Sequence, residues 1–274
     1  MNYTIFVIMS KIKHLSSLQN SLIKKVLLLK DKSRERKKAA LFVLEGQREL
    51  ELALKGGYTI STIFFEPSLF SETSLEKYNS AKEIISVSKE VYQKIAYRGT
   101  TEGIVALVES KNNTLENLKF KNNTPLILIA EAPEKPGNIG ALLRTADAAN
   151  LDAVLIANPK TDLYNPNIIR SSVGCVFTVP VAMGNTNEII SFLNAKNVNI
   201  YCAALTASVN YTSIDYTNAT AIVVGTEATG LTDTWLNASK KNIIIPMEGE
   251  IDSMNVSVSA SIILFEAKRQ RQTS

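Results

Sequence analysis

The sequence lacks the residues on which several classes of protein depend. Its 274 residues include two cysteines, Cys175 and Cys202, and a single histidine, His14. Two cysteines provide neither a disulfide framework nor a cysteine-based metal cluster. One histidine excludes a histidine metal site and, away from residue 14, a histidine-centred catalytic triad. We therefore expect no metal centre and no disulfide-stabilised scaffold.

A long apolar run and a strong charge of one sign are also missing. No apolar stretch reaches the roughly 18 residues that a membrane-spanning helix needs. The short apolar start precedes the first lysine, which is the reverse of a secretory signal, so we expect a cytoplasmic protein. The net charge of +4 is mild, but residues 1 to 110 carry 17 Lys and Arg against 12 Asp and Glu. The basic character therefore lies in this part of the chain.

The most informative stretch of the sequence runs from Pro125 to Ala157. Leu126 to Ala130 is an apolar run of strand length, as expected when helices cover both faces of a parallel sheet. A stretch rich in proline and glycine then breaks the chain, and Asn138 is positioned to cap a helix. Apolar residues recur after it at helical spacing, namely Ile139, Leu142, Leu143, Ala146 and Ala149.

Arg144 lies opposite the centre of this apolar stripe when each residue is stepped by about 100°. Such a position is typical of a solvated helix face, where charged side chains belong. The preceding turn, however, follows the carboxyl end of a parallel strand, where open α/β sheets bind ligands. Free N–H groups at a helix start also favour anions. A role for Arg144 in a site is therefore the second interpretation.

The segment from Pro136 to Ala148, PGNIGALLRTADA, resembles motif 1 of the SpoU family of RNA 2′-O-ribose methyltransferases, members of the SPOUT superfamily. The resemblance implies that Asn138 and Arg144 belong to a catalytic centre, where the arginine acts on the ribose 2′-hydroxyl. The pKa of arginine exceeds about 12, so its guanidinium stays protonated. We therefore hypothesise that Arg144 chiefly stabilises the developing alkoxide.

A second segment, AIVVGTEATGL from Ala221 to Leu231, is an apolar strand that runs into a glycine loop. Glycines at 225 and 230 allow a positive φ or a close approach of the backbone to a ligand. On its own, such a turn is more often structural. In this register it resembles SpoU motif 2, which implies that Gly225 lies against the cofactor and Glu227 near the catalytic centre.

In the last segment, Asn242 to Met247 predicts a strand, and Ser253 to Gln270 predicts a helix that Asp252 or Ser253 caps. The segment resembles SpoU motif 3. This resemblance assigns to the cofactor site Ile245, Met247, Met254 and Ser257, and to the catalytic centre Ser253 and Asn255. Helix capping is the alternative role for Asn138 and Asn255.

Upstream of these motifs, strands alternate with helices and predict a small α/β domain. The expected strands are 41–44, 60–65, 84–87 and 103–108, and the expected helices are 15–30, 47–55 and 88–96. The phrases FVLEGQRELELAL and TTEGIVALVE resemble the L30e-like substrate-binding domain attached to many SpoU enzymes. The polar segment Lys111 to Asn123 is the expected linker, and we place the two domains at residues 1–112 and 113–274.

A basic stretch in the N-terminal part has two interpretations. It is either a solvated connection or a surface that follows RNA phosphates, with an affinity that falls steeply with salt. Its residues predicted to bind RNA are Lys32, Arg34, Arg36, Lys37 and Lys38. Arg170 matches a family segment that borders the RNA, and a strand is expected from Phe177 to Val181.

The expected fold class is α/β. The resemblance implies a C-terminal SPOUT trefoil-knot domain with a mostly parallel sheet, S-adenosyl-L-methionine as cofactor, and a homodimer with the active site near the subunit boundary. It also implies methylation of a ribose 2′-hydroxyl in RNA, with 23S-type ribosomal RNA preferred over transfer RNA. Two alternatives stay open, a non-catalytic ribosome-associated RNA-binding protein and a nucleotide-binding enzyme that uses GNIGALLRT as a phosphate loop. That stretch matches neither G-x-x-x-x-G-K-[ST] nor G-x-G-x-x-G.

Overall fold

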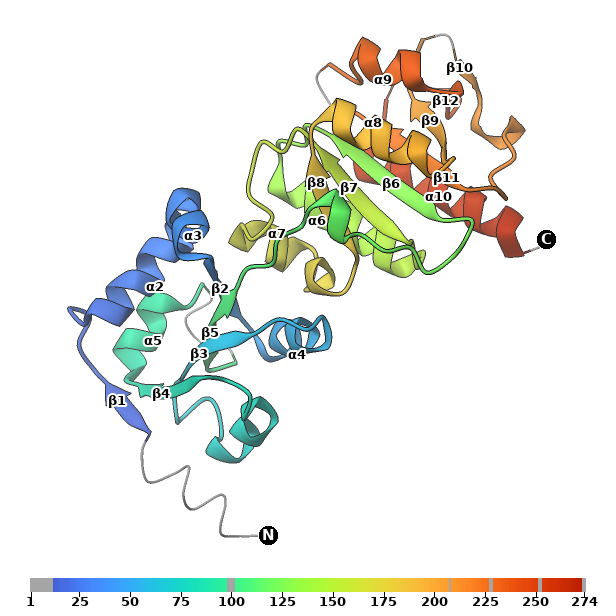
Figure 1. Ribbon diagram of the computed structural model, residues 1–274. Coiled ribbons are helices and arrows are strands. Elements are labelled where there is room, and N and C mark those ends of the chain that lie inside the picture. Colours follow the sequence, from blue (N-terminus) through green and yellow to red (C-terminus); the bar gives the residue numbers. More distant parts are fainter. Residues whose placement is uncertain (1–11, 98–101, 207, 227–228, 251–252, 273–274) are drawn as a thin grey trace. The chain divides into compact units, whose positions relative to one another are not determined.

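The computed structural model describes residues 12–97, 102–206, 208–226, 229–250 and 253–272. The chain divides into two compact units, one of Met1–Lys111 with Tyr164–Pro166 and the other of Asn112–Leu163 with Asn167–Ser274. Each unit has its own sheet (Figure 1). Each also has its own apolar core. We keep the limits 1–112 and 113–274 as a proposal for the two domains.

The N-terminal unit has a mixed five-stranded sheet. Its strands are β1 (Lys13–Leu15), β2 (Leu41–Glu45), β3 (Ile60–Phe65), β4 (Glu83–Val87) and β5 (Ile104–Glu109). In the order β1-β4-β3-β5-β2, β1, β4 and β3 pair in parallel, and β5 is antiparallel to both of its neighbours. The predicted small α/β domain is therefore confirmed.

The helices of this unit follow the predicted apolar faces, with a difference at the first one. They are α2 (Ser21–Asp31), α3 (Ser33–Ala39), α4 (Gln47–Lys55), α5 (Lys89–Ile95) and the 3₁₀ helix η1 (Glu72–Tyr78). The helix expected from residue 15 begins at Ser21. Leu15 instead pairs with Val87 in the sheet. Asn20 then caps α2 by accepting a hydrogen bond from the N–H of Leu22.

The C-terminal unit is built on a seven-stranded sheet in which every pairing between described strands is parallel. The strands are β6 (Leu126–Glu131), β7 (Ala153–Ala157), β8 (Val181–Gly184), β9 (Asn199–Ala203), β10 (Ser208–Asn210), β11 (Thr220–Val224) and β12 (Lys241–Ile244). Their order is β10-β12-β9-β11-β6-β7-β8. Strand β6 is buried along its whole length, and the predicted parallel sheet is confirmed.

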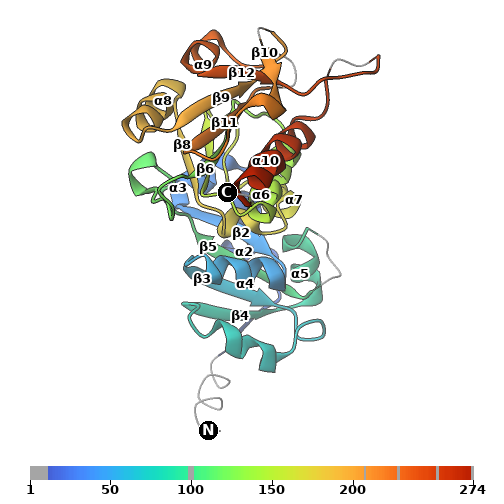
Figure 2. The same cartoon turned by 90° about the vertical axis from the view of Figure 1, so that its right-hand side faces the viewer.

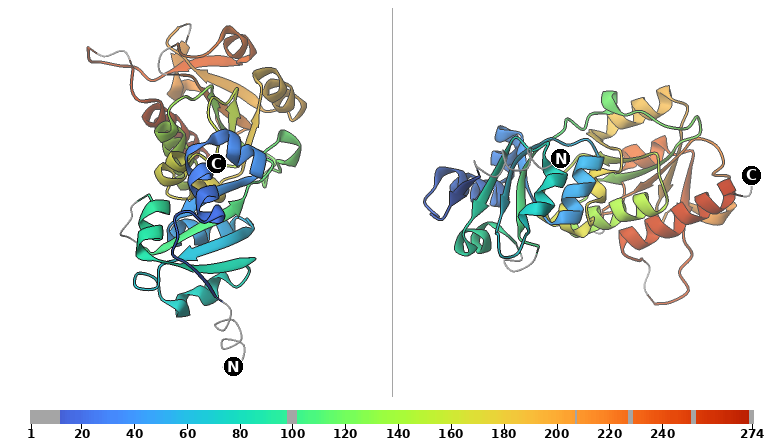
Figure 3. Two further views of the ribbon diagram at one scale, coloured as in Figure 1. Left: turned by 90° about the vertical axis from the view of Figure 1, so that its left-hand side faces the viewer. Right: turned by 90° about the horizontal axis from the view of Figure 1, so that it is seen from below.

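Helices cover both faces of this sheet (Figure 3). They are α6 (Pro136–Ala148), α7 (Pro166–Ser171), α8 (Thr186–Ala195), α9 (Asp233–Ala238) and α10 (Val256–Gln272), with the 3₁₀ helices η2 (Leu115–Asn117), η3 (Cys175–Phe177) and η4 (Tyr211–Ser213). Side chains of α8 and α9 share a core with Ile127 and Ile129 of β6. Helices α6 and α10 lie side by side (Figure 2).

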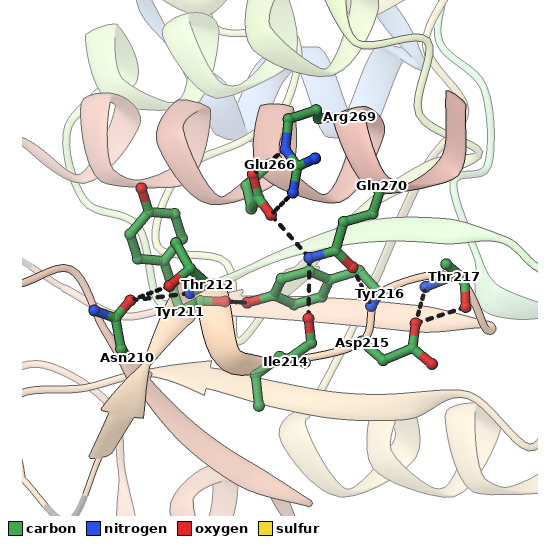
Figure 4. A network of polar contacts seen from close by, with 10 residues as sticks. All are labelled: Asn210, Tyr211, Thr212, Ile214, Asp215, Tyr216, Thr217, Glu266, Arg269 and Gln270. Carbon is green, nitrogen blue, oxygen red and sulfur yellow. Dashed lines mark hydrogen bonds and ion pairs between the residues drawn. The ribbon is translucent and has the colours of Figure 1, made fainter. Parts of the chain in front are cut away.

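The C-terminal end of α10 is fastened to the segment that precedes β11. Gln270 Oε1 accepts a hydrogen bond from the N–H of Tyr216 at 2.9 Å, and its Nε2 donates to the Ile214 carbonyl at 3.0 Å (Figure 4). The Arg271 guanidinium donates to backbone carbonyls of Thr124, Pro125, Tyr216 and Asn218. The basic end of this helix therefore fixes α10 to the rest of the unit.

Two predicted boundaries near the motifs are wrong. Helix α6 begins at Pro136 with Lys135 as its N-cap residue, so Asn138 lies in the first turn. Helix α10 begins at Val256, and Asn255 caps it, since its Oδ1 accepts a hydrogen bond from Ser257 N at 2.9 Å. Ser253 is therefore not the cap, and the other predicted cap, Asp252, lies outside the described residues.

Two other segments also differ from expectation. The strand expected from Phe177 to Val181 is wrong, because residues 175–177 form η3 and β8 begins at Val181, level with Val154 of β7. An apolar run alone does not distinguish a strand from a short helical turn. In the predicted linker, Leu115 is buried in the C-terminal core.

The trefoil knot stays a prediction. Within the described residues, no helix is long and apolar enough to cross a membrane.

Candidate active site

A pocket lies at the carboxyl ends of β6 and β11, where open α/β sheets bind ligands. The two strands are parallel neighbours, so the loops that follow them leave the same edge of the sheet. The cavity has a volume of about 370 Å³ and is lined by Ala130, Ala132, Pro133, Glu134, Lys135, Asn138, Leu142, Lys160, Gly225, Thr226, Thr229 and Val256. It therefore joins predicted motif residues from three distant parts of the sequence.

The loop after β11 folds back on itself beside this pocket. Thr226 and Gly230 exchange two backbone hydrogen bonds, each 3.1 Å long, and Thr229 N donates to Thr226 Oγ1 at 3.1 Å. A Cβ on Gly225 would lie 2.3 Å from the carbonyl carbon and oxygen of Gly230. Gly225 is therefore required by the loop itself and also lines the pocket, and its predicted contact with a cofactor stays a prediction.

Glu131, which the sequence analysis did not identify, holds the far end of the same loop. It ends β6 and is buried, with 3% of its surface exposed. Its Oε2 accepts a hydrogen bond from Thr232 N, and its Oε1 accepts one from Thr232 Oγ1, both at 2.9 Å. A carboxylate that ends an otherwise apolar buried strand is the signal that could have identified it.

The two motif asparagines are brought together. Asn255 Nδ2 donates to Asn138 Oδ1 at 3.3 Å, and Asn255 Oδ1 accepts from both the N and the Oγ of Ser257 at 2.9 and 2.7 Å. Farther along the helices, Thr145 and Ser261 join their hydroxyls at 2.8 Å. Helices α6 and α10 therefore run side by side in the same direction, and Asn255 both caps α10 and contacts α6.

Arg144 is exposed on α6, on the side away from the core, as its spacing predicts. It lies six residues beyond Asn138, about 9 Å along the helix axis. It does not line the pocket. Within the described residues, no hydrogen bond or ion pair joins its guanidinium to another side chain. A single chain therefore places the predicted catalytic arginine on the solvent side of α6.

The remaining predicted residues lie between β12 and α10 and in the first turn of α10. In the connecting segment Ile245, Met247 and Met254 are partly exposed and Ser253 is exposed, and Ser257 in α10 is partly exposed. Among the described residues, the pocket lining does not include them. Their predicted contacts with a cofactor stay a prediction. Glu227 lies outside the described residues.

The predicted RNA-binding residues divide into two groups. The first group has exposed side chains and consists of Lys32, Arg34, Lys37, Lys38 and Arg170. Arg36 is instead buried at 5% exposure, and its Nη1 donates to the carbonyls of Leu29 and Lys30 at the end of α2, at 2.7 and 3.1 Å. The prediction for Arg36 is corrected, because a buried guanidinium held by backbone carbonyls does not reach an RNA phosphate.

Helix α7, which carries Arg170, packs closely on α6. A Cβ on Gly140 would lie 2.0 Å from Ser171 Oγ and 2.7 Å from its backbone carbonyl carbon. Ser171 Oγ also donates to the Pro136 carbonyl at 3.3 Å. Gly140, the second glycine of GNIGALLRT, therefore permits the close contact between α6 and α7.

The described residues indicate neither a reactive thiol at Cys202 nor a metal cluster. Burial raises the pKa of the Cys202 thiol to about 12, so this side chain stays a neutral thiol. Within the described part of the chain, no group of three or more His, Cys, Asp or Glu side chains is arranged to hold a metal ion.

Comparisons with known proteins identify the family to which this site belongs. The SpoU rRNA Methylase family matches residues 125–265, about half of the chain. The chain belongs to the SpoU rRNA methylase family. Residues 20–106 match the MRM3-like substrate binding domain. The resemblance drawn from the three motifs is therefore confirmed, and the matched residues 125–265 contain the pocket and the Asn138–Asn255 pair.

Several members of the SpoU family are similar over nearly their whole length. The 23S rRNA (guanosine(2553)-2'-O)-methyltransferase RlmP of Bacillus subtilis is 28% identical over 93% of this chain and 99% of that protein. A crystal structure of an RNA 2'-O ribose methyltransferase has a TM-score of 0.81 at 35% identity, covering 94% of this chain and 99% of its own. The AdoMet-bound rRNA methyltransferase of Sinorhizobium meliloti has a TM-score of 0.86 at 26% identity, covering 94% and 98%.

Proposed function

We propose that this chain transfers a methyl group from S-adenosyl-L-methionine to a ribose 2′-hydroxyl of RNA, with 23S-type ribosomal RNA as substrate. The observation that carries the proposal is the pocket at the ends of β6 and β11, beside the contact between Asn138 and Asn255. Membership of the SpoU family and the 23S rRNA activity named for the Bacillus subtilis relative support it. Such an enzyme would act in the cytoplasm.

The pocket fits S-adenosylmethionine in size and in chemistry. Its volume of about 370 Å³ falls within the roughly 300–1,000 Å³ of small-molecule sites. Backbone groups of the loop from Gly225 offer hydrogen bonds, and Leu142 and Val256 offer apolar contact. We assign the rest of the cradle to Ile245, Met247, Met254 and Ser257. When bound, this cofactor supplies the electrophilic methyl group.

On the RNA side, Arg144 supplies positive charge to the ribose oxygen as its proton leaves. Because the guanidinium stays protonated at any physiological pH, its contribution is electrostatic and is largest where water is excluded. Asn138 and Asn255 fix the start of the two helices next to the reacting groups. Ser253 and Glu227 complete the proposed polar centre.

A second copy of the chain would cover α10 and bring Arg144 to a pocket. On the side of α10 opposite its buried face, Val258 and Phe265 are 47% and 50% exposed, and Ile262 between them is partly exposed. Three apolar residues at i, i+4 and i+7 form one stripe. We propose that this stripe is the homodimer contact, which also explains why Arg144 lies outside the pocket of its own chain.

Sedimentation velocity tests the dimer. The chain is expected to sediment as a dimer, Phe265→Glu as a monomer, and the control Leu69→Glu, at an exposed leucine of the other unit, as a dimer. In addition, at a limiting cofactor concentration, a mixture of Arg144→Ala chains and Gly225→Ala chains should be more active than either variant alone, because one site of the mixed dimer has both an intact pocket and an intact arginine. A monomeric wild type, or mixtures no more active than either variant alone, would contradict the shared site.

Transfer of a labelled methyl group tests the function. Purified chain is incubated with labelled S-adenosylmethionine and either 23S rRNA or transfer RNA from cells without the gene. Label is expected in 23S rRNA. Calorimetry under the same conditions measures cofactor binding, which separates an enzyme from a non-catalytic RNA-binding protein. Label only in transfer RNA would replace the proposed substrate, and no binding and no transfer would refute the function.

A further inference from the structure

We infer that Glu131 is a positioning residue of the cofactor pocket, which acts through Thr232 by holding the returning arm of the loop that begins at Gly225. The inference rests on the proposed function, because the pocket is the one assigned to S-adenosylmethionine. Glu131 does not itself line the cavity, whereas its neighbours Ala130 and Ala132 do. Its effect on a ligand is therefore indirect.

The contacts of Glu131 are specific and complete. A carboxylate is an acceptor with two oxygens, and here one oxygen accepts the backbone N–H and the other the hydroxyl of Thr232, both at 2.9 Å. A buried charge is costly unless it is hydrogen-bonded or paired. Within the described residues, no Lys or Arg side chain forms an ion pair with it. The carboxylate is therefore stabilised by the residue that it holds.

The position of Thr232 connects this contact to the pocket. Thr232 is two residues beyond Gly230, which exchanges two hydrogen bonds with Thr226 of the pocket wall. The backbone of Gly230 also occupies the space that a side chain on residue 225 would need. Thr232 then starts α9, since its carbonyl accepts from Trp235 N. Glu131 therefore anchors one end of the loop to β6, and β11 anchors the other end.

Asp152 is a matched control, because its carboxylate contacts the opposite end of β6. Asp152 is 7% exposed, and its two oxygens accept hydrogen bonds from Leu126 N and Asn122 Nδ2, both at 2.9 Å. Leu126, which Asp152 contacts, begins β6 and Glu131 ends it, so about 16 Å of strand lies between the two contact points. Both are buried acceptors of two bonds. A role in folding alone therefore predicts the same behaviour for both.

The experiment compares Glu131→Ala, Glu131→Gln and Asp152→Ala with the wild type. S-adenosylmethionine affinity is measured by calorimetry, Tm by thermal unfolding, and exchange of the loop amides by hydrogen–deuterium exchange without cofactor. Glu131→Ala should weaken cofactor binding by about tenfold or more, because the N–H and the hydroxyl of Thr232 both lose the acceptor that holds the loop in place. It should also speed exchange at Thr232 and Gly230.

The Glu131→Gln variant separates the effect of the hydrogen-bond geometry on cofactor affinity from the effect of the negative charge. In Glu131→Gln, the amide oxygen still accepts from Thr232 N, and the NH₂ can donate to Thr232 Oγ1, so affinity should stay within about threefold of wild type. Asp152→Ala should lower Tm but leave affinity and loop exchange unchanged. If Glu131→Ala is too unstable to assay, Thr232→Val removes one of the two bonds and should weaken binding by a smaller factor.

Two results would overturn the inference. One is a folded Glu131→Ala chain that binds S-adenosylmethionine as the wild type does and keeps its loop exchange slow. The other is an Asp152→Ala chain that loses affinity to the same extent. A wild-type chain that binds no S-adenosylmethionine would instead refute the proposed function, while the exchange data would still decide whether Glu131 holds the loop.

Discussion

At the scale of single residues, the site depends on close approaches that leave no room for other side chains. Gly225 faces the backbone of Gly230, and Gly140 faces Ser171. Asn255 serves two purposes, because one end of its amide caps α10 and the other contacts Asn138. Substitutions at these positions therefore separate structural roles from roles in the reaction.

Gly225→Ala is expected to reduce S-adenosylmethionine affinity by about tenfold or more, because the added Cβ meets backbone rather than a flexible side chain, and the loop must shift. Gly249→Ala is the control, since no atom lies within 4 Å of its Cβ position. Calorimetry on both variants makes the comparison. Equal affinities for the two would show that the loop is not part of the cofactor site.

Asn255→Asp keeps the capping oxygen but removes the amide donor to Asn138. We expect its Tm to match or exceed that of the wild type, because a carboxylate is a good N-cap and interacts favourably with the helix dipole. Its kcat should fall about tenfold, the effect of losing one hydrogen bond worth about 1.4 kcal/mol in the transition state. Unfolding and methyl-transfer rates check both. Full turnover would mean that capping is the whole role of Asn255.

At the scale of elements, α10 has its N-terminal end at the site and its C-terminal end in a polar network. In that network Arg269, through two hydrogen bonds, and Gln270 hold the pKa of Glu266 at about 2, below its usual 4.5 (Figure 4). A depressed pKa means that the unfolded chain takes up its proton first. The stabilisation is therefore complete above about pH 4.5 and is lost as the pH falls toward 2.

This network predicts a pH dependence of stability. Between about pH 5 and pH 2.5, the unfolding free energy of the wild type should fall more steeply with decreasing pH than that of Glu266→Gln, which has no carboxylate to protonate. Urea denaturation at several pH values in this range gives both slopes. Arg269→Met should flatten the dependence in the same way. Parallel slopes for wild type and Glu266→Gln would contradict the assignment.

Elements with regular apolar spacing are those that the sequence predicted well. The limits of α4 and β3 and the solvent-facing position of Arg144 all follow from periodicity. Periodicity failed where a distant partner decides the outcome. Leu15 joins a strand because it pairs with Val87, and Glu131 was missed because its partner Thr232 is 101 residues away. Arg36 is a different case, since the basic run did not reveal that carbonyls at the end of α2 bind its guanidinium.

At the scale of the whole molecule, each unit carries a different part of the proposed activity. The exposed cations of α3 belong to the N-terminal unit, which matches a substrate-binding family, and the pocket belongs to the C-terminal unit. The expected homodimer would pair two C-terminal units. Binding of RNA and binding of cofactor should therefore be separable by substitution.

Replacing Lys37 and Lys38 with glutamine is expected to weaken RNA binding without changing cofactor affinity. Each lost phosphate contact should reduce the slope of log K against log salt concentration by about 0.7 to 0.9. Binding of 23S rRNA fragments is measured at several salt concentrations, with the exposed Lys89→Gln as control. An unchanged slope in the double variant would place the RNA on another surface.

The position of the transferred methyl group tests the central claim most directly. After reaction with S-adenosylmethionine, 23S rRNA is digested to nucleosides and analysed by mass spectrometry. We predict one ribose 2′-O-methylated nucleoside with the wild type, and a yield at least about a hundredfold lower with both Arg144→Ala and Arg144→Lys. Alanine removes the positive charge, and lysine keeps a charge but lacks the planar guanidinium that sets its position. A methyl group on a base, or full 2′-O-methylation by Arg144→Ala, would contradict the account.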